Sequence, residues 1–308
     1  MWVERILLFD SSGPAMSNNY REYKGGPLRL AIESSSSVRS ASIKRISVGT
    51  DIAASHVALL VRDLQVSYGP KRAVQGVSLQ IRDGEIFGLL GPNGAGKTST
   101  LSAIEGLLKP DSGSILIGGI DARANPTSAK ARIGVQLQST SFHASLNIRE
   151  IVSLYGGLYG LSLSRAQVLD YLRDMHLDQE ASKHFGQLSG GQQKRLSLLI
   201  ATLHDPELVL LDEPTAGLDP QARRQLWDRI EAIRKTGRSI LLTTHSMEEA
   251  QSVCDRVAIM DHGRILTDDT PAGLIEKHKD DPSVRAVARG QVTLEDVFIG
   301  LTGSDLRE

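Results

Sequence analysis

Residues Gly91–Thr100 read GPNGAGKTST, and this short stretch decides how the rest of the chain is interpreted. It matches the spacing G-x-x-x-x-G-K-[ST] at Gly91, Gly96, Lys97 and Thr98. The apolar run EIFGLL, typical of a buried strand, precedes it, and STLSAIEGLL, which favours a helix, overlaps its end. Glycines let the backbone wrap around a phosphate, while the lysine reaches the β- and γ-phosphates and the hydroxyl binds Mg²⁺. This context predicts a nucleotide phosphate loop rather than a glycine-rich structural loop.

An acidic pair follows a second apolar run. The stretch ELVLLDEP, residues 207–214, is apolar without alternation, which is typical of a strand buried on both faces. We expect Asp212, at its end, to hold Mg²⁺ through a water molecule. Glu213 comes next and points elsewhere, so we expect it to face the attacking water. Taken alone, the pair is also compatible with an ordinary polar strand end; the phosphate loop favours the metal site.

Composition and charge limit the classes of protein. The 308 residues are 40% hydrophobic and 23% charged, which is ordinary for a globular chain, and the formal net charge of −1 gives no reason to expect nucleic-acid binding. The single cysteine, Cys254, excludes an intrachain disulfide, and its apolar neighbours predict a buried thiol. No apolar run approaches the roughly 18 residues of a membrane-spanning helix. We therefore expect a cytoplasmic chain without a membrane span of its own.

The chain divides into an atypical start and a regular remainder. Residues 1–55 are rich in Ser and Gly, and we predict a disordered N-terminal extension, with a regulatory arm as the alternative. From residue 56, strand and helix patterns alternate, which indicates an α/β fold with a largely parallel sheet. We expect a nucleotide-binding domain at 56–278, with a helical subdomain at about 139–204, and a short helical tail at 279–308.

A second phosphate-binding element is indicated far from the first. The stretch LSGGQ, Leu188–Gln192, opens with a Ser-Gly-Gly turn and continues as a helix. Backbone N–H groups at such a helix start form an anion-binding arrangement. The sequence thus raises the question of why one chain carries two such elements.

Together these motifs resemble the ATP-binding-cassette (ABC) family over roughly residues 57–303. The resemblance rests on the loop at Lys97, LSGGQ, LLDEP at Leu210–Pro214, GLDP at Gly217–Pro220, and LLTTHSMEEA, which contains His245. It implies a P-loop ATPase core with a largely parallel sheet, an antiparallel β subdomain and an inserted α-helical subdomain. The end of the chain, VTLEDVFIGLTG, is similar to single-cassette export ATPases of the drug-resistance and polysaccharide-export type.

The resemblance also implies site residues. Four are implied to be catalytic: Glu213, His245, Gln138 and Lys97. Three are implied to bind the metal: Thr98, Gln138 and Asp212. The ATP-binding residues within one subunit are implied to be Tyr68, Gly91, Pro92, Asn93, Gly94, Ala95, Gly96, Lys97, Thr98, Ser99, Gln138, Asp212 and His245. Residues implied to contact the ATP of a second subunit are Ser189, Gly190, Gly191, Gln192 and Asp219.

Some of these assignments have alternatives. Tyr68 matches an aromatic residue that stacks on adenine, but it is also compatible with an ordinary strand-end tyrosine. Gln136 competes with Gln138, because both are expected on the same face of one strand; the family pattern Ile-Gly-x-x-x-Gln selects Gln138. Phe142 and Ile148, with Leu146, are expected to line a groove for the membrane partner, or else to pack the helical subdomain's own core.

The resemblance implies an ATP-hydrolysing subunit that powers export through a separate polytopic membrane permease. A second ATPase subunit, identical or paralogous, is the other implied partner, and ATP and Mg²⁺ are the implied cofactors. The subunit is expected on the cytoplasmic face of the cell membrane, held there by the permease. A soluble ABC-type ATPase acting on ribosomes or DNA is the alternative; the single Lys97-type loop and the near-neutral charge disfavour it.

Overall fold

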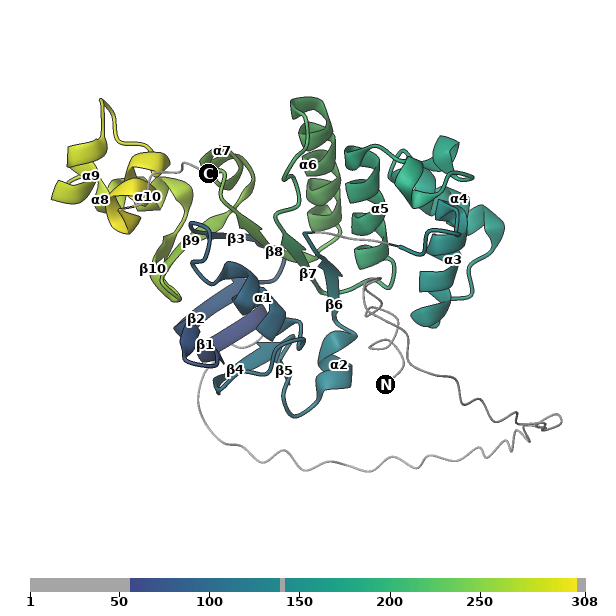
Figure 1. Cartoon of the computed structure of the whole chain (residues 1–308), viewed down its shortest axis with the longest axis horizontal. Coiled ribbons are helices and arrows are strands. Elements are labelled where there is room, and N and C mark those ends of the chain that lie inside the picture. The colour runs from purple at the N-terminus through teal and green to yellow at the C-terminus, as the bar shows by residue number, and fades with distance from the viewer. Residues whose placement is uncertain (1–55, 139–141, 304–308) are drawn as a thin grey trace, which may run out of the picture. The chain divides into compact units, whose positions relative to one another are not determined.

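The computed structural model describes residues 56–138 and 142–303, all within the compact unit Asp51–Glu308 (Figure 1). The predicted disordered extension, residues 1–55, lies outside the described residues. The chain from Val57 to Gly303 forms two sheets and the helices that cover them. Within the described ranges, no helix has the length and apolar character needed to cross a membrane.

The smaller sheet is antiparallel and has the strand order β2-β1-β4-β5. Its strands are β1 (Val57–Tyr68), β2 (Lys71–Arg82), β4 (Ser112–Ile117) and β5 (Ile120–Asp121). In β2, buried residues alternate with exposed ones from Val77 to Arg82, because one face of the sheet packs on the core. This sheet is the antiparallel subdomain that the family resemblance implied.

The larger sheet has the order β10-β9-β3-β8-β7-β6. Neighbouring strands from β9 to β6 are parallel, and β10 pairs antiparallel with β9. The bounds are β3 (Ile86–Leu90), β6 (Ile133–Gln136), β7 (Leu208–Asp212), β8 (Ser239–Thr244), β9 (Arg256–Asp261) and β10 (Arg264–Asp269). Every residue of β3, β7 and β8 is buried, which explains why these runs are apolar without alternation.

Helices cover both faces of this sheet (Figure 1). One face packs with α1 (Lys97–Ile104) and the antiparallel sheet into one hydrophobic cluster. The other face packs with α5 (Gly190–Thr202), α6 (Pro220–Lys235) and α7 (Met247–Val253) into a second cluster. A short helix, α2 (Pro126–Lys130), precedes β6. The mixed α/β class with a largely parallel sheet is confirmed.

A helical region lies between β6 and β7, where the sequence predicted an inserted subdomain. It contains α3 (Ile148–Leu158), α4 (Arg165–Asp174) and α5. Each helix begins with a capping box, in which the side chains of the N-cap residue and the third helical residue each bond the other's backbone N–H. The N-cap residues are Asn147, Ser164 and Ser189. These local signals fix where the helices start.

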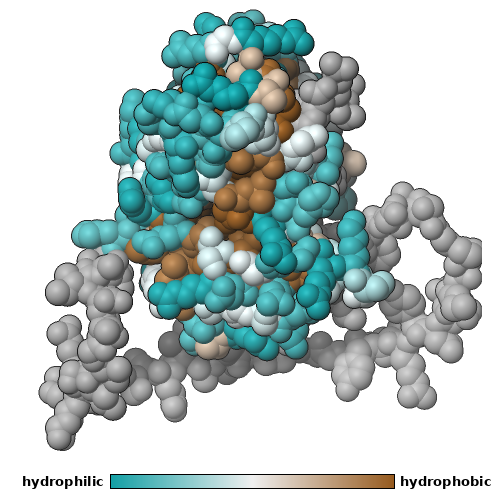
Figure 2. Space-filling model, turned by 90° about the vertical axis from the view of Figure 1, so that its left-hand side faces the viewer, coloured by the Kyte–Doolittle hydropathy of each residue, from teal (hydrophilic) through white to brown (hydrophobic). Residues whose placement is uncertain are grey.

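Three short helices end the described chain: α8 (Pro271–His278), α9 (Pro282–Val287) and α10 (Leu294–Thr302). Thr270 caps α8 and Thr293 caps α10, as their sequences predicted. Leu274, Val284 and Phe298 of these helices are fully buried in the same cluster as α5 and α6, so they pack on the core. Figure 2 views this side of the molecule and shows a band of apolar side chains between hydrophilic ones.

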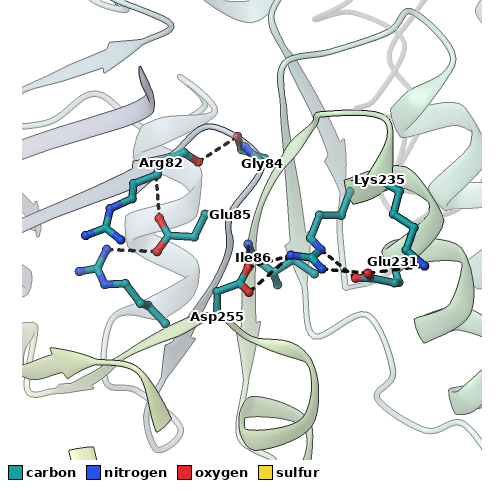
Figure 3. Close-up of polar contacts among 10 residues, drawn as sticks. Arg82, Gly84, Glu85, Ile86, Glu231, Lys235 and Asp255 are labelled. Atoms are coloured by element: carbon teal, nitrogen blue, oxygen red, sulfur yellow. Dashed lines mark hydrogen bonds and ion pairs between the residues drawn. The ribbon is translucent and has the colours of Figure 1, made fainter. Parts of the chain in front are cut away.

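An ionic network that includes the buried Glu85 fixes the starting edge of the central strands (Figure 3). Glu85, only 6% exposed, accepts a hydrogen bond from the Arg82 N–H at 2.6 Å and another from Arg256 Nη1 at 3.3 Å. Asp255 accepts from the Ile86 N–H at 2.9 Å and lies 3.4 Å from Arg234 Nη1 of α6. The network joins β2, β3, β9 and α6 at the edge opposite the phosphate loop.

We expect Glu85→Ala to lower the free energy of unfolding by about 1–3 kcal/mol, because the Arg82 N–H and the Arg256 guanidinium lose this acceptor while Arg256 keeps its second partner, Asp268. Urea denaturation followed by circular dichroism measures the change. Lys235→Ala is the matched control: this side chain is 73% exposed and lies 3.9 Å from Glu231, so a change of about 0.5 kcal/mol or less is expected. Equal effects of the two substitutions would contradict a structural role for the Glu85 network.

Candidate functional site

The phosphate loop connects β3 to α1, and its glycines are sterically required. A Cβ on Gly91 would lie 2.3 Å from the Met260 carbonyl oxygen, and one on Gly96 would lie 2.4 Å from the Ala73 carbonyl oxygen. Gly94 and Gly96 also have positive φ angles of 82° and 106°. The first turn of α1 carries no acidic residue and no side-chain cap, so its N–H groups face the loop without competition from a carboxylate.

Lys97 supplies the positive charge of this loop. Its side chain is folded inward, and Nζ donates to the carbonyl oxygens of Gly91 at 2.6 Å and Pro92 at 3.1 Å. Burial lowers the pKa of Lys97, while the nearby carboxylates of Glu213 and Asp212 act in the opposite direction. The ammonium group therefore lies between the backbone of the loop and the two acidic side chains predicted from LLDEP.

Asp212 and Thr98 lie together, as the sequence predicted. Thr98 Oγ1 donates to Asp212 Oδ2 at 3.3 Å, and Thr243 Oγ1 donates to Asp212 Oδ1 at 2.5 Å. Among the residues that the structure describes, no group of three His, Cys, Asp or Glu side chains forms a metal cluster. One carboxylate and one hydroxyl nevertheless suit Mg²⁺, which is usually held by one or two protein oxygens together with substrate phosphates and water.

Three loops converge on the carboxylate of Glu213. Its Oε2 accepts a hydrogen bond from Gln138 Nε2 at 2.9 Å, and its Oε1 lies 3.3 Å from His245 Nδ1. These residues follow β6, β7 and β8, which are neighbours in the sheet. Glu213 has a φ of 44°, and its N–H donates to Thr243 Oγ1 at 3.0 Å. A non-glycine residue in this conformation is held there by its surroundings, a common feature of active sites.

The structure separates the two candidate glutamines. The expectation that Gln136 and Gln138 share one strand face is wrong, because β6 ends at Gln136, the last residue paired with β7. Gln136 is 1% exposed, and both polar atoms of its amide are buried without a partner. Gln138 is exposed and reaches Glu213, so the geometry agrees with the choice of Gln138.

Other residues around the site were not singled out from the sequence. Lys194 of α5 donates from Nζ to the Gln138 carbonyl oxygen at 2.8 Å, and burial lowers its pKa. Thr243 bridges Asp212 and the Glu213 N–H. A threonine inside an apolar strand gives little signal in a single sequence. Tyr68, by contrast, is 51% exposed at the end of β1, and its hydroxyl lies 3.4 Å from Ser99 Oγ, beside the loop as expected.

The LSGGQ element is the start of α5. The helix begins at Gly190, so both glycines of the expected Ser-Gly-Gly turn already belong to the helix. The reason is the cap: Ser189 Oγ accepts from the Gln192 N–H at 3.3 Å, and Gln192 Oε1 accepts from the Ser189 N–H at 2.9 Å. Gly191 packs where a Cβ would lie 2.9 Å from Ala222 Cβ of α6. In the described part of the chain, no hydrogen bond or ion pair links 189–192 to the loop 91–99.

Asp219 caps α6, and its Oδ1 accepts from the Ala222 N–H at 2.8 Å.

The residues expected to line a groove for a membrane partner pack within the helical region. Ile148 is fully buried in the core, and the Phe142 ring packs edge-on against Tyr155 and Phe185 at 5.4 and 4.9 Å. These contacts favour the alternative, in which the segment packs the helical region's own core.

Comparison with known proteins identifies the family. Residues 74–216 match the family described as ABC transporter, and residues 184–250 match an AAA domain. The chain is 41% identical over 217 residues to "Nod factor export ATP-binding protein I" of Burkholderia orbicola, covering 70% of this chain and 71% of that protein. It is 39% identical over 226 residues to the protein of the same name from Rhizobium sp., covering 73% and 74%. The chain belongs to the ABC transporter family of ATP-binding proteins.

Solved structures agree with this family. A structure titled "Structure of ATP binding subunit of ABC transporter" has a TM-score of 0.70 and 28% identity, covering 79% of this chain and 99% of that one. "Dimeric Structure of MJ0796, a Bacterial ABC Transporter Cassette" has a TM-score of 0.63 and 25% identity, covering 69% and 98%. This ABC protein is the nucleotide-binding, ATP-hydrolysing subunit of a transporter, and the ribosome or DNA alternative is not favoured.

One further carboxyl lies near the acidic side of this ABC site. Glu105, which ends α1, is 6% exposed, and its Oε2 is buried without a partner. Burial raises the pKa of Glu105 to about 7, and the charge of Asp212 adds to the increase. In the folded protein this carboxyl therefore holds a proton at pH values where an exposed glutamate has lost it.

Because the folded pKa lies above the unfolded value of 4.5, the folded state binds more protons between these two values. Stability should fall as the pH rises from about 4.5 to about 7 and then level off. Glu105→Gln removes the titrating group, so we expect its stability relative to the wild type to rise by about 1–3 kcal/mol between pH 5 and pH 8. Urea denaturation of both proteins at the two pH values measures this. A stability difference that does not change with pH would contradict it.

Proposed function

We propose that the loop 91–99 binds the phosphates of ATP and that Glu213 activates the water that attacks the γ-phosphate. The observation that supports this proposal most strongly is the convergence of Gln138, Glu213 and His245, from three neighbouring strands, beside Lys97. Parallel α/β sheets bind ligands at the carboxyl ends of their strands, and these residues lie at that edge. The N–H groups at the start of α1 and the Lys97 ammonium neutralise phosphate charge, while Tyr68 stacks on the adenine.

Thr98 and Asp212 are the residues that would hold Mg²⁺, with Gln138 as a further ligand. When bound, the ion neutralises charge on the β- and γ-phosphates. The Thr243 hydroxyl, which donates to Asp212 at 2.5 Å, keeps that carboxylate turned toward Thr98. The protein thus supplies a fixed oxygen pair at the strand edge, next to the loop that holds the phosphates.

Glu213 accepts a proton from the water, and His245 and Gln138 set the direction of its carboxylate. His245 Nδ1 lies 3.3 Å from one oxygen and Gln138 Nε2 lies 2.9 Å from the other, so both oxygens are oriented. In this proposal His245 turns to the γ-phosphate when ATP is bound. Lys194 holds the Gln138 backbone, which connects the helical region to the site.

The second phosphate element, residues 189–192, serves the ATP of a second subunit. Two facts support this: no hydrogen bond or ion pair among the described residues links 189–192 to the chain's own loop, and a related cassette has a dimeric structure. Ser189, Gly190 and Gly191 would meet the partner's γ-phosphate, with Gln192 and Asp219 close by. Hydrolysis then removes the group that bridges the two subunits, and the pair opens.

Export through a separate permease completes the proposal, because the relatives are named for Nod factor export. The exposed apolar side chains of α3, Leu154 and Leu158, lie one helical turn apart and are 46% and 45% exposed. We infer that this face, rather than Ile148, docks the permease and holds the subunit on the cytoplasmic face of the membrane.

We expect Lys97→Ala to weaken Mg-ATP binding about 10- to 100-fold, because it removes a charge-assisted contact to the phosphates. We expect Glu213→Gln to keep binding and to hydrolyse ATP about 10²- to 10⁴-fold more slowly, because it keeps the shape and loses the base. Fluorescent-nucleotide titration and phosphate release measure the two effects. Lys109→Ala, in the exposed segment after α1, is the control. Wild-type binding and turnover in Lys97→Ala would exclude this site.

The permease proposal predicts that the full chain, purified from detergent-solubilised membranes of its own cells, carries a polytopic membrane protein identifiable by mass spectrometry. Leu154→Glu with Leu158→Glu should lose that protein and keep basal ATPase activity and melting temperature, because both side chains are exposed. Recovery of ribosomes or DNA in place of a membrane protein would contradict the proposal and support the soluble alternative.

A further inference from the structure

A buried carboxylate, that of Glu249, contacts the two segments that carry Glu213 and His245. Glu249 belongs to the first turn of α7 and is 4% exposed. It contacts neither the phosphate loop nor Asp212. The neighbouring Glu248, by contrast, is exposed. A buried carboxylate is costly unless its oxygens are paired, so its partners show what it holds together.

Both oxygens of Glu249 are paired, one with the last residue of β8 and the other with the loop after β7. Oε2 accepts a hydrogen bond from Thr244 Oγ1 at 2.8 Å, and Oε1 accepts a short hydrogen bond from Thr215 Oγ1. Arg223 Nε of α6 lies 3.7 Å from Oε1 and adds a charge partner. The Ser246 hydroxyl accepts from the Glu249 N–H at 3.3 Å and fixes its backbone.

These partners stand next to the proposed catalytic residues. Thr244 immediately precedes His245, and Thr215 follows Glu213 by two positions. The loop of Thr215 also leads to Asp219, a residue proposed to lie close to the ATP of the second subunit. One carboxylate therefore joins the loop after β7 to the end of β8, directly before His245.

The segments that carry Glu213 and His245 need a further contact to hold them in place. The His245 side chain is 58% exposed, so its single 3.3 Å contact with Glu213 does little by itself to hold the two segments in place. Glu213 keeps a left-handed backbone conformation, which persists only when its surroundings over-determine it. Hydrogen bonds from buried hydroxyls to a carboxylate are stronger than neutral ones and have a defined direction.

We propose that Glu249 is a positioning residue that sets the distance and orientation between Glu213 and His245 by holding both of their loops. The proposal rests on the roles proposed above for those two residues. Because Glu249 does not touch the nucleotide site, its loss should affect the hydrolytic step and leave nucleotide binding unchanged. A displacement of about 1 Å at a reacting group can reduce the rate by about 10²-fold.

The test uses steady-state ATP hydrolysis, fluorescent-nucleotide titration and thermal unfolding of the full chain. Glu249→Ala should lower kcat about 10- to 100-fold, with KM and nucleotide affinity within about 2-fold of the wild type. Glu249→Gln should recover most of the activity, because its amide oxygen still accepts from Thr244 and its NH₂ group donates to Thr215. Glu248→Gln, the adjacent exposed carboxylate, should behave as the wild type.

The isosteric variants Thr215→Val and Thr244→Val each remove one of the two hydroxyl hydrogen bonds to Glu249. They carry the test if Glu249→Ala does not fold. Each should lower kcat without raising KM. Wild-type kcat in these variants, or a parallel loss of kcat, affinity and melting temperature that Glu249→Gln fails to rescue, would overturn the proposal.

Glu213→Gln is measured in parallel, so that a failure of the proposed catalytic role of Glu213 can be distinguished from a failure of the positioning role of Glu249. If Glu213→Gln hydrolyses ATP at the wild-type rate, the proposed catalytic role of Glu213 fails. If Glu213→Gln is inactive and Glu249→Ala has a normal kcat, only the positioning role of Glu249 fails.

Discussion

The register of four parallel strands determines where the chemistry of this protein lies. Asp212 of β7 is paired with Thr243 of β8, and Gln136 at the end of β6 is paired with Leu211 of β7. The strands therefore end side by side, and the residues that directly follow them lie close together at one edge of the sheet. The phosphate loop after β3, on the other side of β8, closes the same edge. A shift of one residue in β7 would turn Asp212 to the opposite face, and the same shift in β8 would turn Thr243.

Much of this arrangement could be predicted from the sequence, because its signals are local. The phosphate loop requires glycines at fixed positions, the apolar runs mark strands buried on both faces, and Thr270 and Thr293 mark helix starts. The end of β6 could not be placed, since strand pairing depends on β7 and not on the sequence around Gln136. The buried states of Glu105 and Glu249 also escaped prediction, because a glutamate in a helical segment is usually exposed and only tertiary packing buries it.

The same packing explains how the site is kept polar inside a largely apolar core. Thr243, Thr244 and Glu249 form hydrogen bonds that satisfy buried groups at the ends of β7 and β8. The ionic network of Glu85 and Asp255 fixes the opposite edge of the central strands. The sheet is thus held at both edges, while the helical region that carries Ser189 joins the site through contacts such as that of Lys194 with Gln138. Among the described residues, no hydrogen bond or ion pair links that second phosphate element to the chain's own loop.

The central claim is that one chain's LSGGQ element completes the ATP site of another. Size-exclusion chromatography with light scattering on Glu213→Gln tests it directly, since slow hydrolysis should let the closed form accumulate. The account predicts a dimer with Mg-ATP, a monomer without it, and a monomer under both conditions when Ser189→Arg is added, although each chain still binds ATP. If the double variant dimerises with Mg-ATP as well as Glu213→Gln alone, the second element does not bind a partner's nucleotide, and the account is contradicted.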